Sequence, residues 1–249
     1  MKLHQSKLLQ NFYRYQDPSY NLVPGTDHSC RCPTDTFLLW KYFEYYQPKD
    51  ALEIGFFKGQ SMSIMVEAGL DNIELVSIDK KYQQKSKQDF IDLYPDANIT
   101  FYETDSSELD KVLGTKSFDF ILLDGSSKYS MALNDISKCL EAINIDGVIY
   151  VDEVVTDDCP GVQKAVKELL FGQKSWIPFL AGQSGMFFHH ESHDAAFFLD
   201  HFLRKPADRI FNFYQNSNWN DFNVLFVTHP MIFEDHPALF RHSLELYNL

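Results

Sequence analysis

The chain has 249 residues, of which 45% are hydrophobic and 15% aromatic. This composition is typical of a globular protein with a large core and excludes a disordered chain. Its 22 Lys and Arg residues stand against 35 Asp and Glu, so the net charge is −13. A field of that sign repels phosphate backbones and anionic lipids, and we expect neither a nucleic-acid nor a membrane partner.

Targeting signals and cysteine spacing indicate the compartment. The N-terminal segment lacks an uninterrupted apolar run and a small-residue cleavage site, and no stretch has the length of a membrane span. The expected location is therefore cytoplasmic. The four cysteines form no evenly spaced framework and no complete zinc motif, so we interpret them as free thiols. They are Cys30, Cys32, Cys139 and Cys159.

Short apolar segments alternate with segments of helical spacing through the middle of the chain. The first helical pattern runs through Leu133, Ile136, Leu140 and Ile143. The second covers residues 162–170 and begins at Pro160, with Asp157 and Asp158 as candidate caps. This alternation predicts an α/β fold with a parallel sheet covered on both faces. The predicted strands are residues 51–54, 73–78, 99–102, 118–123 and 148–151.

An acidic residue stands at the expected carboxyl end of every one of these strands. Helix capping explains some of these acids, because Asp favours capping positions, but it does not explain Glu53 inside the end of the first strand. Ligands of open parallel sheets bind at this edge. The acids are Glu53, Asp79, Asp105, Asp124 and the pair Asp152-Glu153.

The spacing around the first strand-to-helix turn narrows the ligand. Asp79 lies 20 residues beyond Gly59, where an acid of a βαβ unit accepts hydrogen bonds from ribose hydroxyls. The turn itself, from Gly55 to Gly59, has no glycine between these two and so lacks the dinucleotide pattern. A crowded turn close to Glu53 suits a nucleoside ligand with an ammonium group better than one with phosphates.

Five motifs in register resemble class I S-adenosylmethionine-dependent methyltransferases, most closely the macrocin-type small-molecule O-methyltransferases. They are LEIGFFKGQS, VSID, ETDSSE, FILLDGSSKY and GVIYVDEVV followed by PGVQKAV. The resemblance covers residues 34–190 and implies a Rossmann-like seven-stranded sheet, with residues 176–180 and 186–189 as its last strands. The implied cofactor is S-adenosylmethionine. Its predicted binding residues are Glu53, Gly55, Phe56, Gly59, Ser61, Asp79, Asp105, Ser106 and Asp124.

The resembling families place a divalent ion at the ends of the fourth and fifth strands. Asp124, Asp152 and Glu153 offer the hard oxygen ligands that Mg²⁺ takes, and a bound ion would lower the pKa of a substrate hydroxyl. The alternative is that the Asp152-Glu153 pair only ends a strand and caps a turn. The predicted catalytic residues are Asp124 and Lys128.

Two further features of the second half remain open at this point. Relatives often carry a His that acts as base after the fourth strand, and Ser127 occupies that position here. Lys128 could replace this base, or it could be a solvated lysine at a helix start. His189, His190 and His193 invite a metal interpretation, but we interpret them as exposed side chains.

The predicted organisation is one core with two extensions. Residues 1–36 form a lid or pack on the surface, residues 37–190 form the methyltransferase core, and residues 191–249 pack on the core. The last segment would shape the substrate pocket or a homodimer interface. The predicted activity is methylation of a hydroxyl on a small molecule, a sugar or natural product. The alternatives are a hydroxylase-like relative and a non-catalytic nucleoside-binding protein on the same fold.

Overall fold

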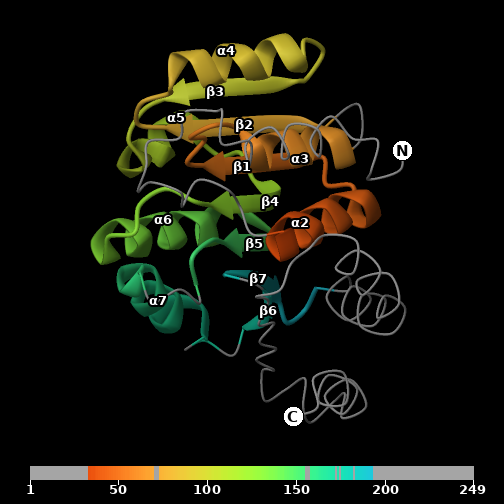
Figure 1. Ribbon diagram of the computed structural model, residues 1–249. Helices are drawn as coiled ribbons and strands as arrows, with labels where there is room; N and C mark the ends of the chain where they lie inside the picture. Colours follow the sequence, from red (N-terminus) through yellow and green to blue (C-terminus); the bar gives the residue numbers. More distant parts are fainter. Residues whose placement is uncertain are drawn as a thin grey trace. The chain divides into compact units, whose positions relative to one another are not determined.

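The computed structural model describes residues 33–69, 73–154, 158–171, 173, 175–181 and 183–192. Its strands belong to a seven-stranded sheet with the order β3-β2-β1-β4-β5-β7-β6 (Figure 1). The pairs β1–β2, β2–β3 and β4–β5 are parallel, and β7 runs antiparallel to both β5 and β6. The α/β methyltransferase-type sheet predicted from the sequence is therefore confirmed. The strands are β1 Asp50–Ile54, β2 Glu74–Asp79, β3 Ile99–Glu103, β4 Phe118–Leu123, β5 Ile143–Val151, β6 Trp176–Ala181 and β7 Ser184–His189.

The described residues form two compact units, which divide between Gly114 and Thr115. In the first unit the helices are α2 Pro33–Tyr46, α3 Gln60–Ala68, α4 Gln84–Leu93, the short 3-10 helix η2 Ser106–Glu108 and α5 Leu109–Leu113. Helix α2 packs against α3. Four of the five residues of β1 are buried, as expected for a parallel strand with side chains packed on both faces.

An aromatic cluster follows the carboxyl end of β1. The Phe56 ring meets the rings of Tyr82, Phe90 and Phe101 edge to face, at centroid distances of 5.5, 5.6 and 5.4 Å. This geometry is favourable because the positive edge of one ring meets the negative face of another. The Tyr82 hydroxyl donates to the Ser77 carbonyl at 2.7 Å, and burial raises the pKa of that hydroxyl. The cluster fixes the start of the β1–α3 turn.

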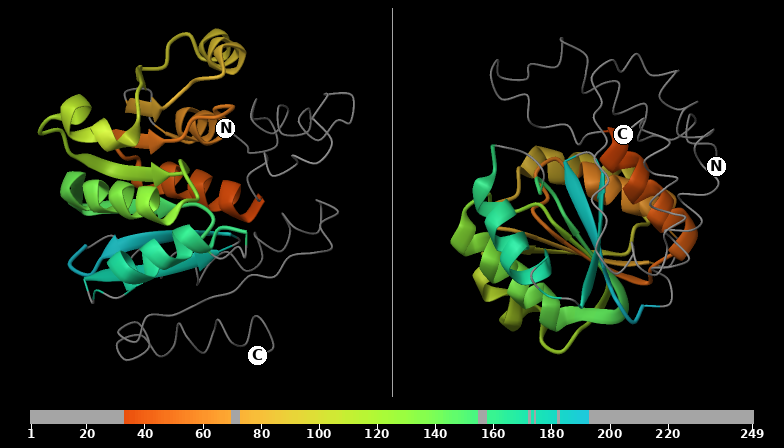
Figure 2. Two further views of the ribbon diagram at one scale, coloured as in Figure 1. Left: turned by 90° about the vertical axis from the view of Figure 1, so that its left-hand side faces the viewer. Right: turned by 90° about the horizontal axis from the view of Figure 1, so that it is seen from below.

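The second unit carries helices α6 Tyr129–Ala142 and α7 Pro160–Val166, and α7 continues as a π-helical turn, η3 Lys167–Phe171. Helices α6 and α7 lie side by side (Figure 2). Gly161 lets α7 approach the loop before α6, because a Cβ there would lie 2.3 Å from the Ser127 carbonyl oxygen. The predicted cap at Asp158 is wrong: Cys159 is the N-cap residue and makes no side-chain cap bond.

Strand β5 begins earlier than the sequence pattern predicts. Ile143, expected as the last apolar residue of a helix, pairs with Phe118 of β4. The register then shifts before Phe120 pairs with Val148. Gly147 lies in the shifted segment, where a Cβ would come within 2.9 Å of the Asp119 carbonyl oxygen. Ile143 is β-branched and fits a strand as well as a helix, so helical spacing alone misassigned it.

Several predictions fall on residues outside the described ranges. They are the segment 1–32, Cys30, Cys32, Asp157, His193 and nearly all of the C-terminal extension. Of the described cysteines, Cys139 and Cys159 are free thiols, as predicted. In the described part of the chain, no helix is both long enough and apolar enough to span a bilayer.

Candidate functional site

The turn between β1 and α3 follows a backbone path that few residues adopt. Gly55 and Gly59 have φ values of 97° and 74°, and Phe57 between them has a φ of 46°. The Gly59 N–H donates to the Phe56 carbonyl at 2.7 Å and closes the turn. Glycine adopts positive φ at little cost, whereas a bulky residue such as Phe57 is strained there. The two glycines are therefore required by backbone conformation.

Gly59 has a second reason to be glycine. A Cβ at this position would lie 2.5 Å from Cζ of Phe56, well inside van der Waals contact. Phe56 is only 2% exposed and belongs to the aromatic cluster, so it has little room to move. Phe56 was predicted to bind the cofactor; its ring lies in the core, so any contact would come from its backbone, and the role stays a prediction.

The Asp79 carboxylate ties this turn to the end of β2. Its Oδ2 accepts the backbone N–H groups of Phe56 at 2.9 Å and Phe57 at 3.2 Å, and its Oδ1 accepts the N–H of Lys81 at 2.9 Å. An ionised carboxylate has about four lone-pair positions, so these three bonds leave about one for a ligand. The acid predicted to hold ribose therefore also orders the glycine turn.

The carboxyl ends of the first three strands are joined by backbone hydrogen bonds. The Gly55 N–H donates to the Ile78 carbonyl at 2.9 Å, and the Thr104 N–H donates to the Asp79 carbonyl at 3.0 Å. These bonds extend the parallel ladders past the last strand residues and hold the three loops at one edge. The predicted site residues of the first unit are thus gathered by the sheet itself.

Glu53, Ser61 and Asp105 differ in environment. Glu53 and Ser61 are buried, at 1% and 5% exposure, in β1 and in the first turn of α3. Asp105 caps η2 by accepting the Ser107 N–H at 3.0 Å, and its other oxygen lies 3.2 Å from Nζ of Lys80. The hydrogen bond from Ser107 and then the Lys80 ammonium hold the pKa of Asp105 below its usual range. Ser106 is the first residue of η2.

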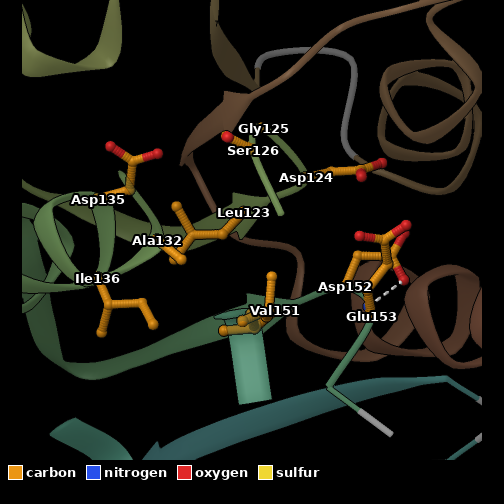
Figure 3. A pocket seen from close by; sticks show the side chains of 11 residues that line it. Leu123, Asp124, Gly125, Ser126, Ala132, Asp135, Ile136, Val151, Asp152 and Glu153 are labelled. Carbon is orange, nitrogen blue, oxygen red and sulfur yellow. Dashed lines mark hydrogen bonds between the residues drawn. The ribbon is translucent and has the colours of Figure 1, made fainter. Parts of the chain in front are cut away.

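In the second unit, a small pocket lies between the carboxyl ends of β4 and β5 and helix α6. Its cavity volume is about 30 Å³, which is room for one or two water molecules. Asp124, Asp135, Asp152 and Glu153 all line it (Figure 3). In the view of Figure 3, Asp135 on α6 lies across the pocket from Asp152 and Glu153. Asp135 is buried and was not predicted as a site residue.

Glu153 is the second strained residue at a strand end, with a φ of 61°. Its Oε2 accepts the Ser127 hydroxyl at 3.0 Å and the Cys159 thiol at 2.8 Å. A left-handed conformation costs on the order of 1–3 kcal/mol, and these two hydrogen bonds offset part of it. Burial and the bond to Glu153 raise the pKa of Cys159, so the thiol is held as a protonated donor.

Asp152 is also hydrogen-bonded within the unit. Its Oδ1 accepts the Ser184 hydroxyl at 2.7 Å and the Glu153 N–H at 2.9 Å. In the ranges that the structure describes, no three His, Cys, Asp or Glu side chains are grouped to hold a metal ion. A metal at Asp124, Asp152 and Glu153 therefore stays a prediction.

The predicted catalytic pair lies at the surface of the second unit. Asp124 and Lys128 are both exposed, and Lys128 is the N-cap residue of α6 without a side-chain cap bond. Their predicted roles are not tested by the structure. His189 is half-buried, and burial lowers its pKa, whereas His190 is exposed as predicted.

The sequence did not predict the contacts that three residues of this region make. Cys159 was interpreted only as a free thiol, and Gly161 only as part of a helix start. Ser184, the first residue of β7, was not considered. The spacing of Gly161 one residue after Pro160 was the available signal for a close backbone approach. No local pattern indicates that Ser184 reaches Asp152, because that contact depends on strand pairing.

Comparison with known proteins finds a matching domain and a shared fold. Residues 52–154 match the family model of a methyltransferase domain. No curated protein sequence matches the chain significantly. Many solved structures share its fold, and several of them are O-methyltransferases.

The first is the O-methyltransferase TomG from Streptomyces achromogenes, involved in tomaymycin synthesis and solved with S-adenosylmethionine. It is 20% identical, the match covers 74% of this chain and 90% of that one, and the TM-score is 0.56. An O-methyltransferase from Bacillus cereus, solved with S-adenosylhomocysteine, is 17% identical over 74% and 91%, with a TM-score of 0.54. CalS11, a TDP-rhamnose 3'-O-methyltransferase of calicheamicin biosynthesis, is 13% identical over 74% and 92%, also with a TM-score of 0.54.

Residues 52–154 thus match a methyltransferase domain, and the described sheet has the fold of solved S-adenosylmethionine-dependent O-methyltransferases. The matched segment begins one residue before Glu53 and ends one residue after Glu153. It therefore includes every cofactor-binding, catalytic and metal-ligating residue predicted from the sequence.

Proposed function

We propose that the chain transfers the methyl group of S-adenosylmethionine to a hydroxyl oxygen of a small molecule, a sugar or a natural product. The observation that carries this proposal is the Asp79-anchored glycine turn inside the matched methyltransferase domain. The choice of oxygen as acceptor is supported by the O-methyltransferases among the similar structures, two of which belong to natural-product biosynthesis.

The groups at the first three strand ends suit the chemistry of this cofactor. S-adenosylmethionine, when bound, supplies an electrophilic methyl group on a positively charged sulfur. The remaining acceptor position of Asp79 would take one ribose hydroxyl, and Gly55 would let the backbone approach the methionine part. We assign the amino-acid end to Glu53 and the adenine to Asp105 and Ser106. The sequence predicted two ribose hydroxyls on Asp79, whereas its three N–H bonds favour one.

A divalent ion is a separate element of the prediction. Asp124, Asp152 and Glu153 provide hard oxygens, but one oxygen of Asp152 and one of Glu153 already accept two protein donors each. These two oxygens would have to give up protein donors to bind an ion, whereas the hydrogen bonds described do not involve the second oxygen of either carboxylate. The ion therefore stays a prediction, and the proposed function does not depend on it. The cytoplasmic location, the absence of nucleic-acid and membrane partners, and the homodimer stay predictions.

Calorimetric titration with S-adenosylmethionine tests the cofactor assignment. Asp79→Ala should weaken binding by roughly 2–3 kcal/mol, the range for hydrogen bonds to a charged group. Asp89→Ala, which removes an exposed carboxylate from α4 of the same unit, should leave affinity unchanged. The 2'-deoxy and 3'-deoxy analogues of S-adenosylhomocysteine separate ribose binding from turn anchoring. If both analogues bind the wild type as well as the parent compound does, Asp79 only orders the turn.

Turnover is then measured as S-adenosylhomocysteine formed with a panel of phenols and nucleotide sugars, with and without Mg²⁺ and with a chelator. Product that forms only with the ion would show that the metal takes part in the reaction. A wild-type protein that fails to bind S-adenosylmethionine would overturn the proposed function. Binding without turnover on any acceptor would favour the non-catalytic alternative.

A further inference from the structure

Phe57 is an exposed aromatic residue at a strained position of the turn between β1 and α3. Its side chain is 48% exposed, whereas that of neighbouring Phe56 is 2% exposed. Its φ of 46° would suit glycine or asparagine without strain. The chain uses glycine at both neighbouring positive-φ positions, Gly55 and Gly59, and yet keeps a phenyl ring here. The hydrogen bond that joins this residue to Asp79 uses its backbone N–H and not the ring.

The Phe57 ring already lies close to one positive charge in this structure. The Lys58 ammonium nitrogen is 5.3 Å from the ring centroid, within the distance at which a ring face attracts positive charge. The Asp79 carboxylate accepts the N–H of Phe57, and Glu53 is the penultimate residue of the preceding strand. Two acids and an aromatic face at one turn match a ligand that carries positive charge next to a ribose.

Resting on the proposed function, we propose that the Phe57 ring contacts the cofactor and binds its positively charged sulfonium through the ring face. Methyl transfer breaks the bond between sulfur and the methyl carbon and leaves the electron pair on sulfur, while the methyl carbon bonds to the acceptor oxygen, whose proton passes to solvent. The sulfur thereby loses its charge, and the attraction of the ring is lost with it. Phe57 therefore makes the site prefer the methyl donor over the demethylated product and assists product release.

Binding of the donor and the product by matched variants tests this inference without any turnover assay. The measured quantity is the ratio of the dissociation constants of S-adenosylhomocysteine and S-adenosylmethionine, obtained by calorimetry. Phe57→Leu keeps an apolar side chain but removes the ring face, and should lower this ratio roughly 2- to 30-fold. Phe57→Trp should keep or raise it, because Trp has the strongest ring face. Ile91→Ala, at an exposed apolar residue of α4, should leave it unchanged.

Phe57→Gly separates binding from folding. It removes the ring and relieves the positive-φ strain, so the variant should unfold at the same or a higher urea concentration while losing the preference for the donor. An unchanged ratio in Phe57→Leu, or an equal loss of affinity for both ligands, would overturn the inference while the proposed function stands. A wild-type protein that binds neither S-adenosylmethionine nor S-adenosylhomocysteine would overturn both this inference and the proposed function.

Discussion

The turns that follow β1 and β5 each hold a bulky residue at positive φ, Phe57 at 46° and Glu153 at 61°. The first turn is fixed by backbone N–H groups that donate to Asp79, a residue of the neighbouring strand. The second is fixed by the side chain of the strained residue itself, which accepts Ser127 and Cys159. The hydrogen bonds that fix the first turn therefore do not involve the Phe57 side chain, whereas those of the second are made by the side chain of Glu153.

This difference separates two ways of holding a strained backbone. A turn held by backbone donors tolerates changes at its strained side chain, which is then available for ligand contact. A turn held by its own side chain couples any change at that residue to local structure. Substitutions should therefore affect the two turns differently, and glycine positions give the largest effects.

Gly59→Ala should give the largest loss of stability in the first turn. The substitution combines a positive φ with a Cβ placed 2.5 Å from the Phe56 ring, so we expect a loss of about 2–4 kcal/mol. The matched control places Gly59→Ala in a Phe56→Leu background, which removes the ring atoms that the new Cβ would meet. Relative to Phe56→Leu alone, the alanine should then cost only the backbone strain of about 1–2 kcal/mol. Urea denaturation measures each variant, and an equal cost of Gly59→Ala in both backgrounds would contradict a packing role for Gly59.

Gly161→Ala should have a smaller effect, confined to the second turn. The new Cβ would meet the Ser127 carbonyl oxygen at 2.3 Å and the Tyr129 nitrogen at 2.5 Å, so α7 or the loop must shift. We expect a loss of about 1–3 kcal/mol, the usual cost of overpacking. Lys167→Ala, an exposed position further along the same helical segment, should change stability by less than about 0.5 kcal/mol. A Gly161 variant as stable as this control would show that the close approach is not required.

The sequence predicted the sheet well because the strands carry strong local signals. Buried parallel strands such as β1 and β4 read as short apolar runs bounded by turn residues, and each was placed within one or two residues. The start of β5 was missed because Ile143 fits both helical spacing and strand pairing. Local periodicity contains no information about which strand lies next to a segment. Ile143 is part of a strand because it pairs with Phe118 of β4.

The sequence predicted which acidic residues lie at the candidate site, but not which residues they accept hydrogen bonds from. The acids at the strand ends could be listed from the sequence, since each directly follows an apolar run. Their partners could not: Asp79 accepts N–H groups from residues 22 and 23 positions away, and Glu153 accepts the Ser127 hydroxyl from 26 positions away. Such contacts arise from strand order and loop geometry. The strain at Phe57 and Glu153 was likewise invisible, because neither residue type signals positive φ.

The smallest expected effect concerns the Cys159 thiol, which reports on the second turn directly. Burial raises its pKa first, and the hydrogen bond to Glu153 raises it further, whereas the Ser127 hydroxyl lowers it. Glu153→Gln removes the negative charge and should lower this pKa, and Ser127→Ala should raise it. Because the thiolate is the reactive form, iodoacetamide labelling of Cys159 should begin at lower pH in the first variant and at higher pH in the second.

Peptide mass spectrometry across a pH series resolves this labelling from that of the other thiols. Cys139 is the internal control, because its pKa is raised by burial and then by Asp135, and neither substitution touches that environment. The two variants should therefore move the Cys159 profile in opposite directions and leave the Cys139 profile in place. If Glu153→Gln left the Cys159 profile unmoved, the thiol would not donate to Glu153. The second turn would then be held by Ser127 alone, and the contrast with the first turn would rest on a single side-chain bond.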